Sequence, residues 1–271
     1  MQERLVEGAF LPSSAKEQFQ IEEKMGLERK NLINERSAKA GPSHLFVEMQ
    51  MAMFKINEPY SMYFSIYKQD EGFVTEEFKV SLTELGLPSD VSLMGRLYTL
   101  FANVNDNDLL QEGHLVVKLY RKGSLLETEK STPTSTKFQR PFACGVINLK
   151  SVYNRLVIGV QNEQSECQIY RPKADKIESC FSDTHELIIQ GRFSELEEIP
   201  MSKGIKMCFT LVQGAVDNFR DSTFLETEYS DVELRSKLKD AHVTLPLRSE
   251  EMVVEQGTSR ESVRIIYKLL P

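Results

Sequence analysis

The sequence lacks the motifs of the common enzyme classes. It contains no Gly-x-Ser-x-Gly, no Gly-x4-Gly-Lys-Ser/Thr and no Gly-x-Gly-x-x-Gly, which excludes, as motifs, a hydrolase nucleophile elbow, a phosphate-binding loop and a dinucleotide-binding turn. The pair His185-Glu186 begins like a zinc-protease helix, but Ile189 stands where the second ligand is required. A single imidazole makes no zinc site, so we expect a surface histidine in a helix, no metal and no cofactor.

A complete calcium loop is also missing. Residues 103–108 (NVNDND) alternate oxygen-bearing side chains, as a calcium site requires. However, Asp108 stands where a glycine is needed, and His114 stands where a glutamate should close the cage. We therefore expect a polar loop between strands.

Cysteines are few and membrane signals are absent. Two cysteines are never closer than 13 residues, which fits neither a metal site nor a redox pair. No apolar run approaches the length of a membrane span, no Asn-x-Ser/Thr sequon occurs, and the first residues are charged rather than apolar. We expect a cytoplasmic protein with free, mostly packed thiols. The cysteines are Cys144, Cys167, Cys180 and Cys208.

Positive charge is in deficit. The chain has 33 Lys and Arg against 40 Asp and Glu, a net charge of -7 and a pI near 5.4. This is the wrong sign for a protein that must neutralise a row of phosphates. We expect no nucleic-acid partner.

The 271 residues suit one large domain or two modest ones, preceded by a helical segment. Residues 16–39 carry many charges, good helix formers and no proline. They predict a helix that is either a solvated linker or a docking helix. A breaker pair, Gly41-Pro42, ends this segment, and we place a boundary after residue 43.

From residue 44 onward the apolar pattern has a period of two, which is typical of strands. Turn-forming clusters separate these runs at short spacing, which favours an antiparallel β-sandwich of C2-like type, mainly β with a few short helices. The expected strands cover residues 44–53, 60–66, 73–80, 96–104, 115–121, 141–149, 155–160 and 205–213.

Later segments are mixed. Residues 161–203 are acidic and less periodic, with one helix expected near 183–193 that Asp183 could cap with Glu186. A second helix is expected over 230–240. A strand pattern at 262–270 stops at Pro271, which predicts that the polypeptide continues beyond this point.

One basic stretch stands out. Residues 118–140 hold six Lys or Arg against two Glu, around a Ser/Thr/Pro loop. Near an anionic membrane each basic group adds about 1 kcal/mol of binding, whereas many charged hairpin loops are only solvated. The candidate residues for contact with an anionic lipid or a partner are Lys118, Arg121, Lys122, Lys137 and Arg140.

Several segments together resemble the N-terminal region of the DOCK (dedicator of cytokinesis) family over residues 20–270. The sharpest match is the Arg-Pro-Phe strand at 140–149, where we expect Phe142 to pack in the core. The order and spacing of the segments carry the resemblance. They are 44–48 (HLFVE), 63–67 (YFSIY), 86–88 (GLP), 97–101 (LYTLF) and 140–149 (RPFACGVINL).

The resemblance implies a part of an exchange factor for Rac-type small GTPases, in the branch that works with ELMO adaptors. It implies a helical linker at 1–43, a β-rich domain at 44–261 and the start of the C2-like DOCK homology region 1 at 262–271. The exchange domain of the family, DOCK homology region 2, lies further along the family's chain, so no catalytic residue is carried over. The expected role is a non-catalytic regulatory scaffold that packs against neighbouring domains, with plasma-membrane recruitment. The alternative is a stand-alone sandwich that binds a peptide or anionic lipid.

Overall fold

A computed structural model describes residues 42–52, 58–104, 110, 112–123, 138–157, 162–173, 181–199 and 204–247. The predicted helix over 16–39, the predicted strand over 262–270 and most of the predicted polar loop at 103–108 lie outside these residues. The strands are β1 (Ser43–Ala52), β2 (Tyr60–Lys68), β3 (Gly72–Phe73), β4 (Phe78–Leu82), β5 (Tyr98–Phe101), β6 (His114–Gly123), β7 (Phe138–Asn148), β8 (Glu163–Cys167), β9 (Ile169–Pro172), β10 (Leu196–Glu198), β11 (Ile205–Gln213) and β12 (His242–Thr244). The α-helices are α3 (Leu149–Val157), α5 (Thr184–Ile189), α6 (Ser222–Glu228) and α7 (Val232–Asp240), and the 3-10 helices are η1 (Val91–Leu93), η3 (Phe193–Glu195) and η4 (Val216–Arg220).

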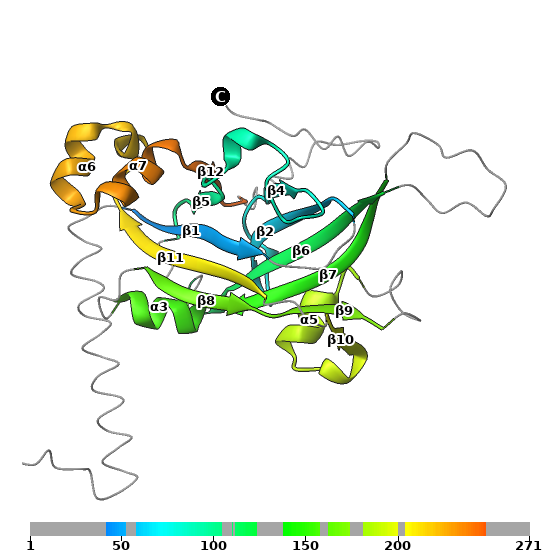
Figure 1. Ribbon diagram of the computed structural model, residues 1–271. Coiled ribbons are helices and arrows are strands. Elements are labelled where there is room, and N and C mark those ends of the chain that lie inside the picture. Colours follow the sequence, from blue (N-terminus) through cyan, green and yellow to red (C-terminus); the bar gives the residue numbers. More distant parts are fainter. Residues whose placement is uncertain are drawn as a thin grey trace, which may run out of the picture.

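The described strands form two sheets (Figure 1). Sheet A has the order β12-β5-β1-β11-β8, and sheet B has the order β10-β9-β7-β6-β2-β3, with β4 also paired to β2. The pairs are antiparallel except for β12 with β5. The prediction of a mainly β protein built as an antiparallel sandwich is confirmed.

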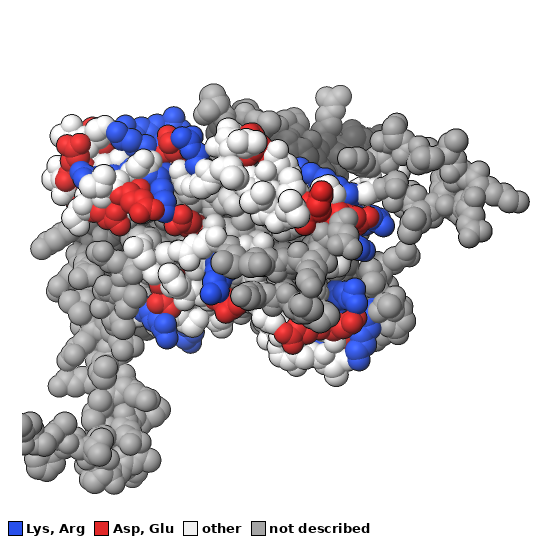
Figure 2. Space-filling view, viewed as in Figure 1, with Lys and Arg blue, Asp and Glu red and all other residues white. Residues whose placement is uncertain are grey.

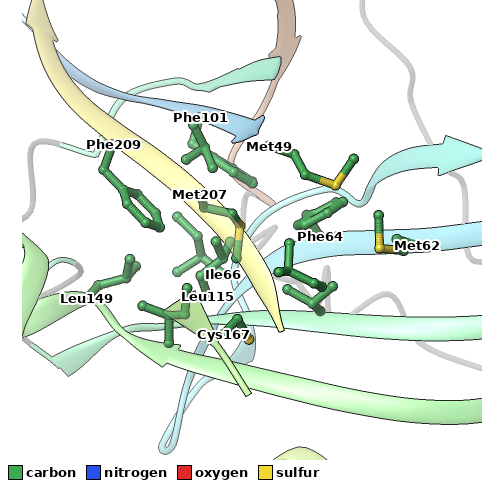
Figure 3. Close-up of a cluster of buried hydrophobic side chains, with 14 of the residues drawn as sticks. Met49, Met62, Phe64, Ile66, Phe101, Leu115, Leu149, Cys167, Met207 and Phe209 are labelled. Atoms are coloured by element: carbon green, nitrogen blue, oxygen red, sulfur yellow. The ribbon is translucent and has the colours of Figure 1, made fainter. Parts of the chain in front are cut away.

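The main core lies between the two sheets (Figure 3). Sheet B contributes alternate residues of β2, including Met62 and Ile66, which are fully buried. Sheet A contributes Met207 and Phe209 of β11, and α3 adds Leu149. Because side chains alternate across a strand, the period-two pattern of the sequence places these residues on one face.

A smaller core lies on the other face of sheet A. Apolar residues of β1, β5 and β11 pack there against η4, α6 and α7, through Phe219, Leu225 and Leu238. Helix α7 begins where expected from the sequence, because the Asp231 carboxylate accepts the amides of Glu233 and Leu234. Helix α6 was not predicted, although Asp221 caps it in the same way.

The predicted strand over 155–160 is wrong for the residues that can be checked, because 155–157 are helical in α3. Asn148 accepts the amide of Lys150, which starts the helix. The four buried residues of this helix follow the spacing i, i+3, i+4 and i+7, which is a helical face. They are Leu149, Val152, Tyr153 and Leu156.

Two further expectations need adjustment. The strand predicted over 73–80 is two short strands, β3 and β4, separated at 74–77. The acidic segment 161–203 contains the predicted helix as α5, but Asp183 makes no side-chain cap hydrogen bond. It also contains β8, β9 and β10, which the weak periodicity did not predict.

Cys144, Cys167 and Cys208 are free and buried, as expected, and Cys180 lies outside the described residues. Burial raises the pKa of the Cys144 thiol to about 12. None of the described helices is both long and apolar enough to cross a membrane.

Candidate interaction surface

The hairpin of β6 and β7 carries four of the five basic residues predicted to contact a lipid or partner, while Lys137 lies outside the described residues. Because neighbouring side chains of a strand point to opposite faces, Lys118 and Lys122 share one face of β6 and Arg121 lies on the other. Arg140 pairs with Arg121 across the two strands, so it shares the face of Arg121. The pleat therefore divides the predicted set into two pairs.

Arg121 and Arg140 surround the carboxylate of Glu58, on the core side of sheet B. The Arg140 guanidinium donates to Glu58 Oε1, and Arg121 Nε lies 3.7 Å from Glu58 Oε2. The Arg121 guanidinium lies over the Phe142 ring, 4.7 Å from its centroid, and Phe142 packs against the main core as expected. A Cβ at Gly123 would meet Glu58 Oε1 at 2.6 Å, so glycine permits this close approach. The Glu58 carboxylate therefore pairs with both arginines and holds their side chains close to each other.

Lys118 and Lys122 lie on the outer face of sheet B. Lys118 Nζ lies 4.1 Å from the centroid of the Phe73 ring, which is a cation–π contact. Lys122 Nζ donates to Ser81 Oγ at 3.3 Å. Lys118 thus contacts an aromatic ring and Lys122 a hydroxyl group. Neither partner is an anion, so neither contact neutralises the charge of the lysine.

Two tyrosines of neighbouring strands, Tyr63 of β2 and Tyr120 of β6, lie on this same outer face. The rings of Tyr63 and Tyr120 meet edge to face, with centroids 5.4 Å apart. Lys79 Nζ lies 5.6 Å from the Tyr63 centroid, and the Tyr63 hydroxyl is within hydrogen-bond distance of the Gln139 amide. Ammonium and phenol groups are both donors to anionic oxygen atoms. The outer face can therefore present several donors to one anionic surface.

Helix α5 packs against another part of the outer face. His185 is only 4% exposed, and its ring lies 4.5 Å from the Tyr67 ring and 5.0 Å from the Phe73 ring, centroid to centroid. Burial, assisted by the nearby positive charge of Lys118, lowers the pKa of His185 to about 4. The expectation of a surface histidine is wrong, because α5 packs its apolar side onto the sheet and carries His185 inward.

No local pattern in the sequence pointed to Glu58, because its partners lie on strands 63 and 82 residues away. The alternation of β2 and β4 could have placed Tyr63 and Lys79 on the outer face. The face of the molecule visible in Figure 2 carries basic and acidic side chains close together, without one extended region of a single sign.

Comparisons with known proteins agree with the resemblance found in the sequence. The family model described as DOCK N-terminus matches residues 11–132. The chain is 24% identical to mouse and human proteins named dedicator of cytokinesis protein 4, over 208 residues that cover 76% of this chain. The match covers 10% of either relative, so the chain spans about a tenth of the length of these curated relatives.

Proposed function

Because the chain carries the N-terminal region of the DOCK family, we propose that it is a non-catalytic regulatory scaffold of a guanine nucleotide exchange factor for Rac-type small GTPases. The match to the DOCK N-terminus over residues 11–132 is the observation that carries this proposal. The chain then serves small GTPase signalling and the control of cytoskeleton and cell migration.

Several polar groups buried in the described residues join neighbouring elements of the fold, which supports a scaffold role. His44 Nδ1 accepts the amide of Asn103 at 2.9 Å, and His44 Nε2 donates to the carbonyl of Gly214 at 2.6 Å. Thr99 and Thr244 share a hydrogen bond of 2.7 Å between β5 and β12. These hydrogen bonds hold neighbouring elements together.

The partners follow from the same proposal. Neighbouring domains of the longer protein pack against residues 44–261, while residues 1–43 link to the preceding part and 262–271 begin the lipid-binding homology region. An ELMO-type adaptor and the Rac-type GTPase bind elsewhere on the longer protein. The site of action is the cytoplasm, with recruitment to the plasma membrane.

A nucleotide-exchange assay tests the non-catalytic role. A Rac-type GTPase loaded with fluorescent GDP is mixed with the 271-residue chain, and release of the nucleotide is followed with and without the chain. The chain should leave the release rate unchanged, and chelation of magnesium with EDTA serves as the control that the loaded nucleotide can leave. Catalytic acceleration by the chain would contradict the proposal.

A second candidate function is contact with an anionic membrane through the outer face of sheet B. The observation that favours it is the grouping of Lys118, Lys122 and Lys79 with Tyr63 and Tyr120 on one face. Each lysine near an anionic surface contributes about 1 kcal/mol, so three support weak binding. Arg121 and Arg140 contribute less to such a contact, because Glu58 already pairs with them.

A further inference from the structure

Two lysine ammonium groups converge on the outer face of β4. Lys79 belongs to β4 itself, and its Nζ lies 5.6 Å from the centroid of the Tyr63 ring on the neighbouring strand β2. Lys122 belongs to β6, but its Nζ donates to the hydroxyl of Ser81 on β4 at 3.3 Å. Because β2 lies between β6 and β4, the side chain of Lys122 carries its charge across one whole strand (Figure 1).

The distance between the two charges follows from the pleat of β4. Lys79 and Ser81 are two positions apart in this strand, so they lie on the same face, about 7 Å from each other along the strand. Since the Lys122 ammonium contacts Ser81, the two ammonium groups occupy successive positions on this face. A phosphate group between them can accept a charge-assisted hydrogen bond from each.

Two hydroxyl groups add further donors at this place. The Ser81 hydroxyl lies 3.2 Å from the hydroxyl of Ser61, which is fully buried, so Ser81 is held in position by its neighbour. The Tyr63 hydroxyl is within hydrogen-bond distance of the Gln139 amide, and its ring packs edge to face on Tyr120. Serine and tyrosine hydroxyls can both donate to phosphate oxygen atoms. Because these groups are held before a ligand arrives, less entropy is lost on binding.

Neither Lys79 nor Lys122 is paired with a carboxylate within the described part of the chain, where the ion pairs involve other residues. The other end of the same face differs. There the charges of Lys118 and Glu186 shift the pKa of the buried histidine of α5 in opposite directions, so a carboxylate partly compensates the lysine. The uncompensated positive charge of this face is therefore centred on Lys79 and Lys122.

The carboxylate of Glu77 limits the size of the positive region. Glu77 lies two residues before Lys79. Burial raises the pKa of Tyr120, and the charge of Glu77 adds to that shift, so this carboxylate acts on the outer face. A broad anionic surface laid on the face would meet the carboxylate and be repelled there. A compact anion between Lys79 and Lys122 lies further from Glu77, so the charges favour a small group of high charge.

We propose that Lys79, Lys122 and Ser81 bind the phosphate monoester head group of a lipid. A phosphate monoester carries close to two negative charges at neutral pH, which matches two lysines, whereas a phosphodiester or a carboxylate carries one. Lys79 is exposed, and Lys122 and Ser81 are half-buried at the surface, so a head group presented by a membrane can reach all three. The inference rests on the second candidate function, contact with an anionic membrane, and names the head-group chemistry that this contact selects.

Co-sedimentation of the 271-residue chain with two kinds of vesicle tests the proposal. Phosphatidylcholine vesicles contain either phosphatidic acid, which is a phosphate monoester, or phosphatidylserine, which is a phosphate diester, in amounts adjusted to the same zeta potential. Wild-type protein should bind the phosphatidic acid vesicles about tenfold more tightly, which is the factor expected for one additional hydrogen bond to a charged group. The double variant Lys79→Gln with Lys122→Gln should lose this preference.

Lys150→Gln with Lys206→Gln is the matched control. Both lysines are exposed and lie outside this face, on α3 and β11. The control has the same net charge as the double variant of the site, and it should keep the preference for phosphatidic acid. Thermal melting checks that each variant is folded.

The outcomes separate this proposal from the second candidate function. Equal binding of wild type to the two kinds of vesicle overturns the proposal but leaves contact with an anionic membrane in place, and so does a preference that the control loses to the same extent. Binding to neither kind of vesicle overturns both. If the chain then binds glycerol 3-phosphate in calorimetry, the site takes a free phosphate monoester and its assignment to a lipid is wrong.

Discussion

Arg121 lies directly opposite Arg140 in the pairing of β6 with β7, and both guanidinium groups contact the carboxylate of Glu58. Two like charges across an antiparallel pair repel each other, and the shared anion offsets that repulsion. The pair therefore contributes to the stability of the hairpin end and is less available to an external anion.

Replacing Glu58 with glutamine should destabilise the protein. The change leaves two cations facing each other without an anion, and we expect a loss of about 1 kcal/mol in the free energy of unfolding, because all three side chains are partly solvated. Urea denaturation measures it. Glu71→Gln is the control, since Glu71 pairs with Lys68 in an exposed turn and should cost less. Equal effects of the two variants would show that the arginine pair needs no anion.

Gly145 of β7 should not tolerate alanine. A Cβ there would meet Cys167 Sγ and Ile169 Cδ1, both at 2.5 Å, so the core must shift, at a cost of roughly 1–3 kcal/mol. Gly191→Ala is the comparison variant. Gly191 has φ of +70° and open space around it, so alanine there strains the backbone without a steric clash. Denaturation should show the larger loss for Gly145→Ala, and a smaller loss there would contradict the packing of β7 against β8 and β9.

Stability should fall as the pH drops from 7 to 5. The pKa of His185 is about 4 in the folded chain and about 6.5 when exposed. Over this range the imidazole becomes protonated in the unfolded state and stays mostly neutral in the folded state. His185 alone should therefore lower the free energy of unfolding by about 2 kcal/mol between pH 7 and pH 5. His185→Phe should reduce the pH dependence of unfolding by that amount. His242→Phe, at an exposed position, is the control, and an unchanged pH dependence in His185→Phe would contradict burial of the imidazole.

The two pairs of basic residues should behave differently toward anionic vesicles. Lys118→Glu with Lys122→Glu should abolish co-sedimentation with phosphatidylserine vesicles, because both lysines lie on the outer face of sheet B. Arg121→Gln with Arg140→Gln should retain most of it, since Glu58 already pairs with these arginines. If the arginine variant loses binding and the lysine variant keeps it, the outer face is not the contact surface.

The sequence could predict most of the sandwich because its longest strands direct an apolar side chain into the main core at every second position. In β2, Met62 and Ile66 alternate with Ser61 and Ser65, and the alternation is a direct consequence of the pleat. The strands of the acidic segment were not predicted, since β8 and β10 expose polar side chains at sheet edges. Residues 155–157 of helix α3 fall within the strand predicted over 155–160, because the β-branched residues of that segment obscured the helical spacing of Leu149, Val152 and Leu156.

The candidate surface was only partly predictable. The basic stretch was evident, but counting charges over 118–140 combined residues of two faces that the pleat separates. Contacts between distant segments had no local pattern, as for Glu58 with Arg140 or for His44 with Gly214, which lie 170 residues apart. Such partners become visible only when the register of the strands is known.

The most direct test of the account is the size of the endogenous protein that contains this segment, measured by immunoblot with an antibody raised against residues 42–247. If the segment is the N-terminal scaffold of a DOCK-type exchange factor, the antibody should detect a protein several times larger than 31.1 kDa, since the matched region is only 10% of its relatives. A product of about 31 kDa as the sole species would contradict the account.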